Sequence, residues 1–196
     1  MQFREHEINS QNNFIMGWYA DDTSFCDELI HWHKTDPDNV NQSGSFYDGN
    51  NVIDKNIKES IDASFSVDTL EWLKFGKVLS QCSELYSKKY DYSICSGYSV
   101  KSPFGVQWYP VGGGYKSWHA ERVVNDPSTI ARHLVFMTYL NDVDDGGTDF
   151  FHQNITVKAE KGLTIIWPAD WTFTHRSQVS HTKEKYVVTG WFELNS

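Results

Sequence analysis

The chain has 196 residues, of which 39% are hydrophobic and 15% aromatic, so it can bury a sizeable core and is not an intrinsically disordered protein. A formal charge of −9, without a cluster of Lys and Arg, disfavours nucleic acid as a partner. No run of about 18 apolar residues occurs, so we expect no membrane contact. Three cysteines without a C-x-x-C pair favour a reduced, cytoplasmic setting over a disulfide framework.

The first 100 residues predict helices and irregular structure. One helix is expected from about residue 22 to residue 34, because capping residues precede an apolar pattern that Pro37 ends. Residues 36–51 are rich in Asp, Asn, Ser and Gly, which predicts a loop. A second helix is expected to begin near Val67. Its apolar face is predicted to comprise Leu70, Leu73, Val78, Cys82, Leu85 and Tyr86.

From about residue 104 the pattern changes to short β-type runs, separated by turn signals at 112–114, 144–147 and 161–162. Such spacing predicts a β-sandwich or barrel. We therefore expect one domain over residues 1–196, mainly β with flanking helices, in which residues 1–100 are a helical support and residues 101–196 form a jelly roll (a double-stranded β-helix). The expected strands are Phe104–Tyr109, Tyr115–Arg122, His133–Leu140, Ile155–Val157, Leu163–Trp167 and Tyr186–Leu194.

Two histidines and one carboxylate are the candidate metal ligands. In a strand, His119 and Glu121 would point to the same face, because side chains alternate along the chain. His175 completes the ligand set of non-haem iron(II) oxygenases, which leaves three metal positions open. His181 is a rival for the third ligand, and the same residue types also bind zinc, so the triad alone does not name the metal.

Lys185 begins a run in which alternate residues share one face of the expected last strand. If that face lines the interior of the barrel, the ammonium needs an anionic partner, because an unpaired buried charge is very costly. The alternative is a solvated Lys at the start of a strand.

These elements together resemble the prolyl 4-hydroxylase-like family of Fe(II)/2-oxoglutarate-dependent dioxygenases. The resemblance covers about residues 104–194. Its elements occur in one order: Tyr109-Pro110, Tyr115, His119-x-Glu121, Arg132, Met137–Asp142, Gly146-Gly147-Thr148-x-Phe150, Lys161-Gly162, His175, Val179, Lys185-Tyr186 and Gly190-Trp191.

The resemblance implies three groups of functional residues. The iron ligands of the family match His119, Glu121 and His175. The side chains that hold the distal carboxylate of 2-oxoglutarate match Tyr109, Thr148 and Lys185. The positions that line the peptide groove of the family match Tyr115, Arg132 and Trp191.

Most of the family carries Asp where this chain has Glu121, whose carboxylate reaches about 1.5 Å farther. Halogenating relatives lack this carboxylate, so halogenation is disfavoured. The resemblance implies Fe(II), 2-oxoglutarate, O2 and L-ascorbate as cofactors and cosubstrates, and hydroxylation of a prolyl residue in a peptide or protein. Two alternatives stay open: the same chemistry on a free amino acid, another side chain or a small metabolite, or a non-catalytic jelly-roll module that binds metal.

Overall fold

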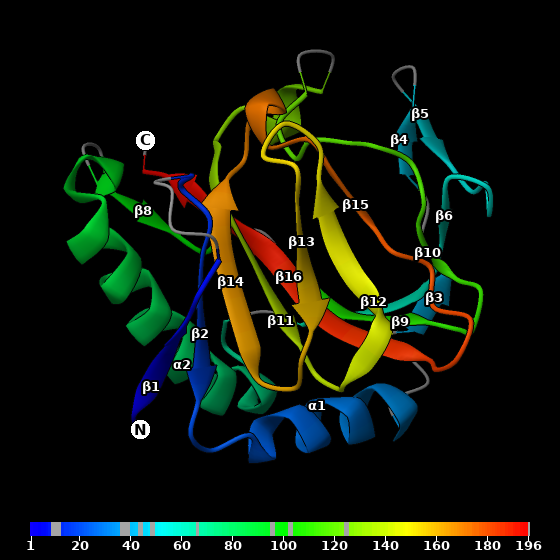
Figure 1. Cartoon of the computed structure of the whole chain (residues 1–196), viewed down its shortest axis with the longest axis horizontal. Helices are drawn as coiled ribbons and strands as arrows, with labels where there is room; N and C mark the ends of the chain where they lie inside the picture. Colours follow the sequence, from blue (N-terminus) through cyan, green and yellow to red (C-terminus); the bar gives the residue numbers. More distant parts are fainter. Residues whose placement is uncertain are drawn as a thin grey trace.

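The computed structural model describes residues 1–8, 13–35, 40–42, 45–47, 50–65, 67–94, 97–101, 104–123 and 126–195 (Figure 1). Its main sheet has nine strands in the order β1-β2-β14-β11-β16-β9-β7-β3, with β8 paired to β16. These strands are β1 (Phe3–His6), β2 (Met16–Ala20), β3 (Val40–Gln42), β7 (Ile61–Phe65), β8 (Tyr98–Ser99), β9 (Phe104–Tyr109), β11 (Arg132–Tyr139), β14 (Leu163–Pro168) and β16 (Lys185–Leu194).

A second sheet faces the main one, in the order β13-β12-β15. Its strands are β12 (Val143–Phe150), β13 (Ile155–Ala159) and β15 (His175–Ser177). Two small sheets pair β10 (Gly114–Tyr115) with β6 (Lys58–Glu59), and β4 (Ser45–Tyr47) with β5 (Asn50–Val52). All pairings are antiparallel, and two facing antiparallel sheets form the predicted jelly roll.

The main sheet buries both of its faces, which explains why β11 is apolar along most of its length. Val135 on this strand packs into an apolar cluster between the two sheets, with Phe150 and Val187. Its neighbour Phe136 points the other way, into a cluster shared with the helices. The sheet is thus covered by strands on one side and by helices on the other, as Figure 1 shows.

The helices are α1 (Ser24–Thr35) and α2 (Leu70–Lys89), as expected from the sequence, and short 3-10 turns occur at Asp91–Ile94, Pro127–Thr129 and Trp171–Phe173. The predicted apolar face of α2 is partly wrong, because Leu70 and Leu73 are 79% and 56% exposed. The residues of α2 that are buried against the sheet are Phe75, Val78, Leu79, Cys82 and Tyr86. None of the described helices has the length and apolar character that crossing a membrane requires.

Three other sequence predictions need correction. The first 100 residues are not only helical, because they contain strands β1 to β8. Within the predicted loop 36–51, the described residues belong to β3, β4 and β5, while Pro37 lies outside the described residues. Residues 144–147 are part of β12 rather than a turn, and the predicted strand 115–122 is reduced to the end of β10 and an isolated bridge at His119.

Candidate active site

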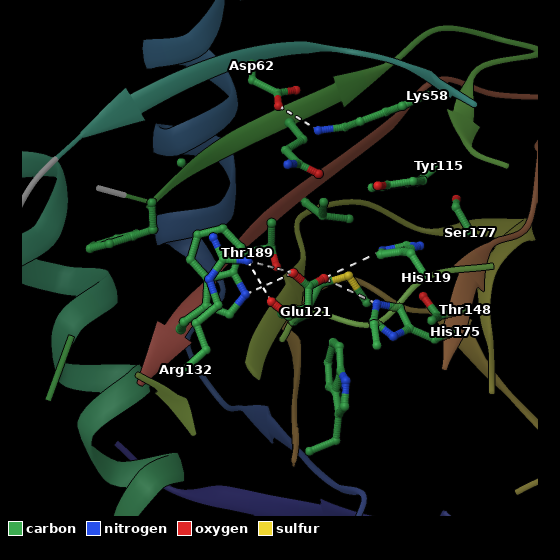
Figure 2. A pocket seen from close by; sticks show the side chains of 18 of the residues that line it. Lys58, Asp62, Tyr115, His119, Glu121, Arg132, Thr148, His175, Ser177 and Thr189 are labelled. Atoms are coloured by element: carbon green, nitrogen blue, oxygen red, sulfur yellow. Dashed lines mark hydrogen bonds and ion pairs between the residues drawn. The ribbon is translucent and has the colours of Figure 1, made fainter. Parts of the chain in front are cut away.

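His119, Glu121 and His175 come together at one point inside the jelly roll (Figure 2). Their ligand atoms all lie within 4.8 Å of one another. Glu121 Oε1 is 3.5 Å from His119 Nε2 and 3.4 Å from His175 Nε2. Adjacent ligands of a metal with bonds of about 2.1 Å are roughly 3 Å apart, so this triad fits one face of an octahedral metal.

A backbone bridge sets the spacing of the two histidines. The amide of His119 donates to the carbonyl of His175 at 3.0 Å, and the reverse bond is 2.9 Å long. His175 also opens β15, which pairs with β12 in the second sheet. The paired backbone segments at His119 and His175 therefore position the two imidazoles. The segment around His119 is not the continuous strand that the sequence predicts.

Each imidazole is held in the tautomer that a metal needs. His119 Nδ1 lies 3.0 Å from the carbonyl oxygen of Ser117, and His175 Nδ1 lies 2.9 Å from that of Phe173. Because a carbonyl only accepts, each Nδ1 carries the proton and each Nε2 keeps its lone pair for a metal. Burial, together with the neighbouring His175, lowers the pKa of His119, which favours the neutral ligand form.

The second carboxylate oxygen of Glu121 is held away from the histidines. Trp191 Nε1 donates to Glu121 Oε2 at 2.9 Å, and Arg132 Nη1 is 3.6 Å from the same oxygen. The guanidinium of Arg132 also stacks on the Trp191 ring, 3.5 Å from its centroid, and donates to the backbone carbonyl of Glu121. These contacts hold one oxygen of the longer side chain, while the other faces the histidines.

The ionisation of Glu121 reflects two opposing effects. Burial raises the pKa of the carboxyl, but the adjacent rings of His119 and His175, when protonated in the absence of metal, outweigh it and hold the pKa well below its usual range. The group is therefore an anion at neutral pH, as a metal ligand must be.

Lys185 is buried, with 3% of its surface exposed, and lines the same cavity as the triad. Its Nζ donates to the carbonyls of Gly146 at 2.6 Å and Gln178 at 3.2 Å, and to the hydroxyl of Ser177. Within the described part of the chain, no carboxylate forms an ion pair with it. Burial lowers the pKa of Lys185 to about 7, with Asp145 acting in the opposite direction. The expected alternation holds, since the cavity is lined by Lys185, Val187, Thr189 and Trp191.

Tyr109 and Thr148 line the same cavity as this ammonium. Tyr109 is the cross-strand neighbour of Lys185, and its hydroxyl donates to Gln107 Oε1 at 2.5 Å. Thr148 Oγ1 accepts a hydrogen bond of 2.7 Å from the hydroxyl of Tyr139, so its own proton is free to point at a ligand. Tyr139 and Gln107 are not among the predicted site residues, although Gln107 is two residues before Tyr109 on the same strand face.

The cavity has a volume of about 380 Å³ and brings together all nine predicted site residues. Tyr115 stacks on the His119 ring with centroids 3.6 Å apart. The rival His181 is exposed and does not join the triad. Lys58 and Asp62 also line the cavity and are not among the predicted site residues, because they lie outside the segment of the family resemblance and carry no recognisable motif.

The residues present fit both iron and 2-oxoglutarate. A His-His-carboxylate set with its protons fixed on the outer nitrogens suits Fe(II) and leaves metal positions open. A buried ammonium whose acceptors among the described residues are neutral, in the same cavity as the Thr148 hydroxyl, suits the distal carboxylate of a keto-acid.

Several solved structures have a similar fold. A viral collagen prolyl hydroxylase from Paramecium Bursaria Chlorella virus-1 aligns with a TM-score of 0.70 at 18% identity, covering 94% of this chain and 98% of that one. A Pseudomonas putida prolyl-4-hydroxylase gives 0.69 at 14% identity, covering 94% and 95%. A Trichoplax adhaerens prolyl hydroxylase, bound to a peptide fragment of the hypoxia inducible factor oxygen degradation domain, gives 0.67 at 19% identity, covering 93% and 84%. At these identities the likeness establishes the fold.

No curated protein matches the sequence significantly. The model of the 2OG-Fe(II) oxygenase superfamily, in contrast, matches residues 104–193, the segment that carries the triad and Lys185. Residues 104–193 are therefore similar in sequence to the 2OG-Fe(II) oxygenase superfamily, and the fold is similar to that of the solved prolyl hydroxylases.

Proposed function

We propose that this protein is an Fe(II)- and 2-oxoglutarate-dependent dioxygenase that hydroxylates a prolyl residue of a peptide or protein. The observation that carries the proposal is one cavity that holds both a facial triad and a buried ammonium without a carboxylate partner among the described residues. A module that only bound metal would gain nothing from desolvating Lys185, which is costly for an unpaired charge.

His119, Glu121 and His175 would hold Fe(II), which supplies the oxidative decarboxylation of 2-oxoglutarate and the transfer of an oxygen atom from O2 to substrate. Lys185 and Thr148 orient the keto-acid by binding its distal carboxylate, and Tyr109 reaches the same end of the cavity. Burial of these groups keeps bulk water away from the reacting centre, which strengthens each polar contact.

A prolyl substrate is supported by the residues on the open side of the triad. Tyr115, Arg132 and Trp191 line the cavity beside Glu121, at the positions that match the peptide groove of the family. The similar structures described above are of prolyl hydroxylases, and one of them holds a peptide.

The test is a turnover assay on the purified chain with Fe(II), 2-oxoglutarate, ascorbate and a panel of proline-containing peptides. We expect succinate and a product 16 mass units heavier, located on proline by fragmentation. The matched control is His175→Ala, which should give neither. Product on a free amino acid or on another side chain would replace the prolyl assignment, and absence of both signals over the panel would contradict the proposal.

The proposal also includes a reducing, cytoplasmic setting and a requirement for ascorbate. The thiols of Cys26 and Cys82 are free and buried, which supports a reduced protein. We expect that omitting ascorbate shortens the linear phase of turnover, and that fresh Fe(II) with ascorbate restores it.

A further inference from the structure

The loop 178–184, which joins β15 to β16, is hydrogen-bonded to β12 through the side chain of Asp145. Asp145 Oδ1 accepts hydrogen bonds of 2.7 Å from the hydroxyls of Ser180 and Thr182, and Oδ2 accepts one of 2.8 Å from the backbone N–H of His181. The Ser180 hydroxyl in turn accepts from the backbone N–H of Lys183 at 3.0 Å. Bonds to a charged acceptor are the stronger kind, so one carboxylate fixes three consecutive loop residues on the strand.

The two segments that Asp145 joins also hold the ammonium of Lys185. On β12, the carbonyl of the next residue, Gly146, accepts from Lys185 Nζ at 2.6 Å. On the other segment, the hydroxyl of Ser177 and the carbonyl of Gln178 accept from the same Nζ. An ammonium has three N–H donors, so these three acceptors engage all of them and set the direction of the side chain.

The positions of these acceptors depend on different contacts. A Cβ at Gly146 would lie 2.5 Å from Val143 Cγ1, so the close packing requires glycine and fixes this carbonyl. The loop is held against β12 at two points. One is the backbone bond of 2.8 Å from the N–H of Gln178 to the carbonyl of Gly147, and the other is the set of bonds to Asp145.

Of the three acceptors, Ser177 is the one that lines the cavity. It is the cross-strand partner of Thr148, and Figure 2 shows both residues on the same side of the cavity. A bound carboxylate can therefore take the place of the Ser177 hydroxyl, while the carbonyls of Gly146 and Gln178 keep the ammonium in position. Asp145 does not line the cavity, so any effect on a ligand must pass through the loop and the ammonium.

We propose that Asp145 is a positioning residue for 2-oxoglutarate: by joining the loop 178–184 to β12, it holds the oxygens that direct the Lys185 ammonium toward the distal carboxylate. This inference rests on the proposed function, because it requires the cosubstrate to bind at Lys185. The charge of Asp145 acts in the same direction, since it raises the pKa of Lys185 whereas burial lowers it. The other titratable group beside the ammonium is Tyr109, whose ring centroid is 5.3 Å from Nζ; burial raises the pKa of its hydroxyl and keeps it neutral.

The experiment measures cosubstrate binding by anaerobic titration of the Fe(II)-loaded protein with 2-oxoglutarate at pH 6. Asp145→Ala should weaken binding about tenfold, the usual cost of losing one hydrogen bond to a charged group, and should leave Fe(II) affinity unchanged. Asp145→Asn keeps one acceptor oxygen for the two hydroxyls but cannot accept from the N–H of His181, so its loss should be about threefold. Asp144→Asn removes the same charge from the neighbouring exposed residue and should change nothing.

A second measurement separates positioning from general damage. The pKa of Lys185 in the ligand-free protein, about 7, can be followed by NMR of the lysine side chain. Asp145→Asn should lower this pKa, because the charge that opposes the effect of burial is removed, whereas a disordered loop that admits water would raise it. The affinity for 2-oxoglutarate should then begin to fall at a lower pH in Asp145→Asn than in the unmodified protein. Asp144→Asn should shift neither quantity.

Each remaining outcome overturns the inference. Unchanged affinity for 2-oxoglutarate in Asp145→Ala would show that the loop contacts do not position the cosubstrate. Equal losses of affinity for Fe(II) and 2-oxoglutarate, or a raised pKa of Lys185, would assign Asp145 to folding alone. In these cases the unmodified protein still binds 2-oxoglutarate and the proposed function stands, whereas a lack of binding by the unmodified protein would remove both.

Discussion

Two regions of the chain line the same cavity with different kinds of side chain. Residues 104–193 supply groups that suit a metal and an anionic cosubstrate: two imidazoles, a carboxylate and the ammonium of Lys185. The first hundred residues supply the helices behind the main sheet and, through β6 and β7, the Lys58–Asp62 pair. Lys58 and Asp62 pair with each other, whereas Lys185 has no carboxylate partner among the described residues. The candidate reacting groups thus lie in residues 104–193, whereas the first hundred residues contribute a wall of the cavity.

The prediction with the largest expected effect tests whether catalysis depends on residues 104–193. His175→Ala removes one of three metal ligands, and no other described histidine joins the triad. Loss of an outer contact of a metal site typically costs about 10- to 100-fold in affinity, so loss of a ligand should weaken Fe(II) binding by more than about 100-fold. Anaerobic Fe(II) titration measures this. Near-normal iron affinity in the folded variant would show that the metal binds elsewhere.

Lys185→Met should separate cosubstrate binding from metal binding. Truncating one partner of a buried charge pair costs about 2–5 kcal/mol, so the affinity for 2-oxoglutarate should fall about 100-fold. Iron affinity should change less than about threefold, because Lys185 contacts none of the metal ligands.

The same substitution should not lower the stability of the ligand-free protein, in contrast to its effect on the affinity for 2-oxoglutarate. Without ligand, the free energy of unfolding should rise or stay constant in Lys185→Met, since a desolvated ammonium is replaced by an apolar side chain of similar length. Denaturant titration at pH 7 measures this. Equal losses of both ligands, together with a lower unfolding midpoint, would instead indicate a folding defect.

The two regions also differ in how far the sequence predicted them. The strands β9, β11, β13, β14 and β16 were predicted nearly to their ends, because their residues alternate or form apolar runs between turn signals. The acidic and glycine-rich run 144–147 carries the signals of a turn, and within β12 it forms an irregularity, because the pairing with β13 shifts register between Val143 and Thr148. The site itself was recognisable because its residues follow a motif order.

The first hundred residues contain fewer sequence signals for secondary structure. Its strands are mostly two to five residues long, too short for alternation to stand out, and β3, β4 and β5 lie in a stretch of turn-forming residues. Lys58 and Asp62 are four residues apart, which on sequence alone indicates an exposed helical pair. Only tertiary folding brings them to the cavity, so their burial could not be predicted.

The binding of 2-oxoglutarate should weaken with rising pH. Burial sets the pKa of Lys185 at about 7 in the absence of ligand, and a bound carboxylate favours the charged form and raises this pKa. Binding above pH 7 therefore takes up a proton, and the affinity should fall by about tenfold per pH unit until the pKa of the complex is reached. Below pH 7 the lysine is already charged and this dependence disappears.

Titrations from pH 6 to pH 9 measure this effect, with Lys185→Arg as the control. Arginine stays charged throughout the range, so the slope should be lost in this variant. An affinity that is constant from pH 7 to pH 9 in the unmodified protein would contradict the assignment of Lys185 to the carboxylate.

The smallest effect concerns Glu121, the residue that departs from the usual Asp. Trp191→Phe removes the hydrogen bond to Glu121 Oε2 and should weaken Fe(II) binding about tenfold, as expected for an outer contact of a metal ligand. Trp171→Phe, at a position 67% exposed, is the matched control and should have no effect.

Combining Trp191→Phe with Glu121→Asp tests why the longer acid is tolerated. The aspartate carboxylate is shorter by about 1.5 Å, so it cannot face both histidines and still reach the indole N–H. Trp191→Phe should then cost less than about threefold in the Asp background, measured as a double-mutant cycle on Fe(II) affinity. The same tenfold loss in both backgrounds would mean that Trp191 supports the site through packing. A smaller loss in the Asp background would mean that the indole N–H of Trp191 and the longer side chain of Glu121 act as a unit. Both residues lie within the segment 104–193.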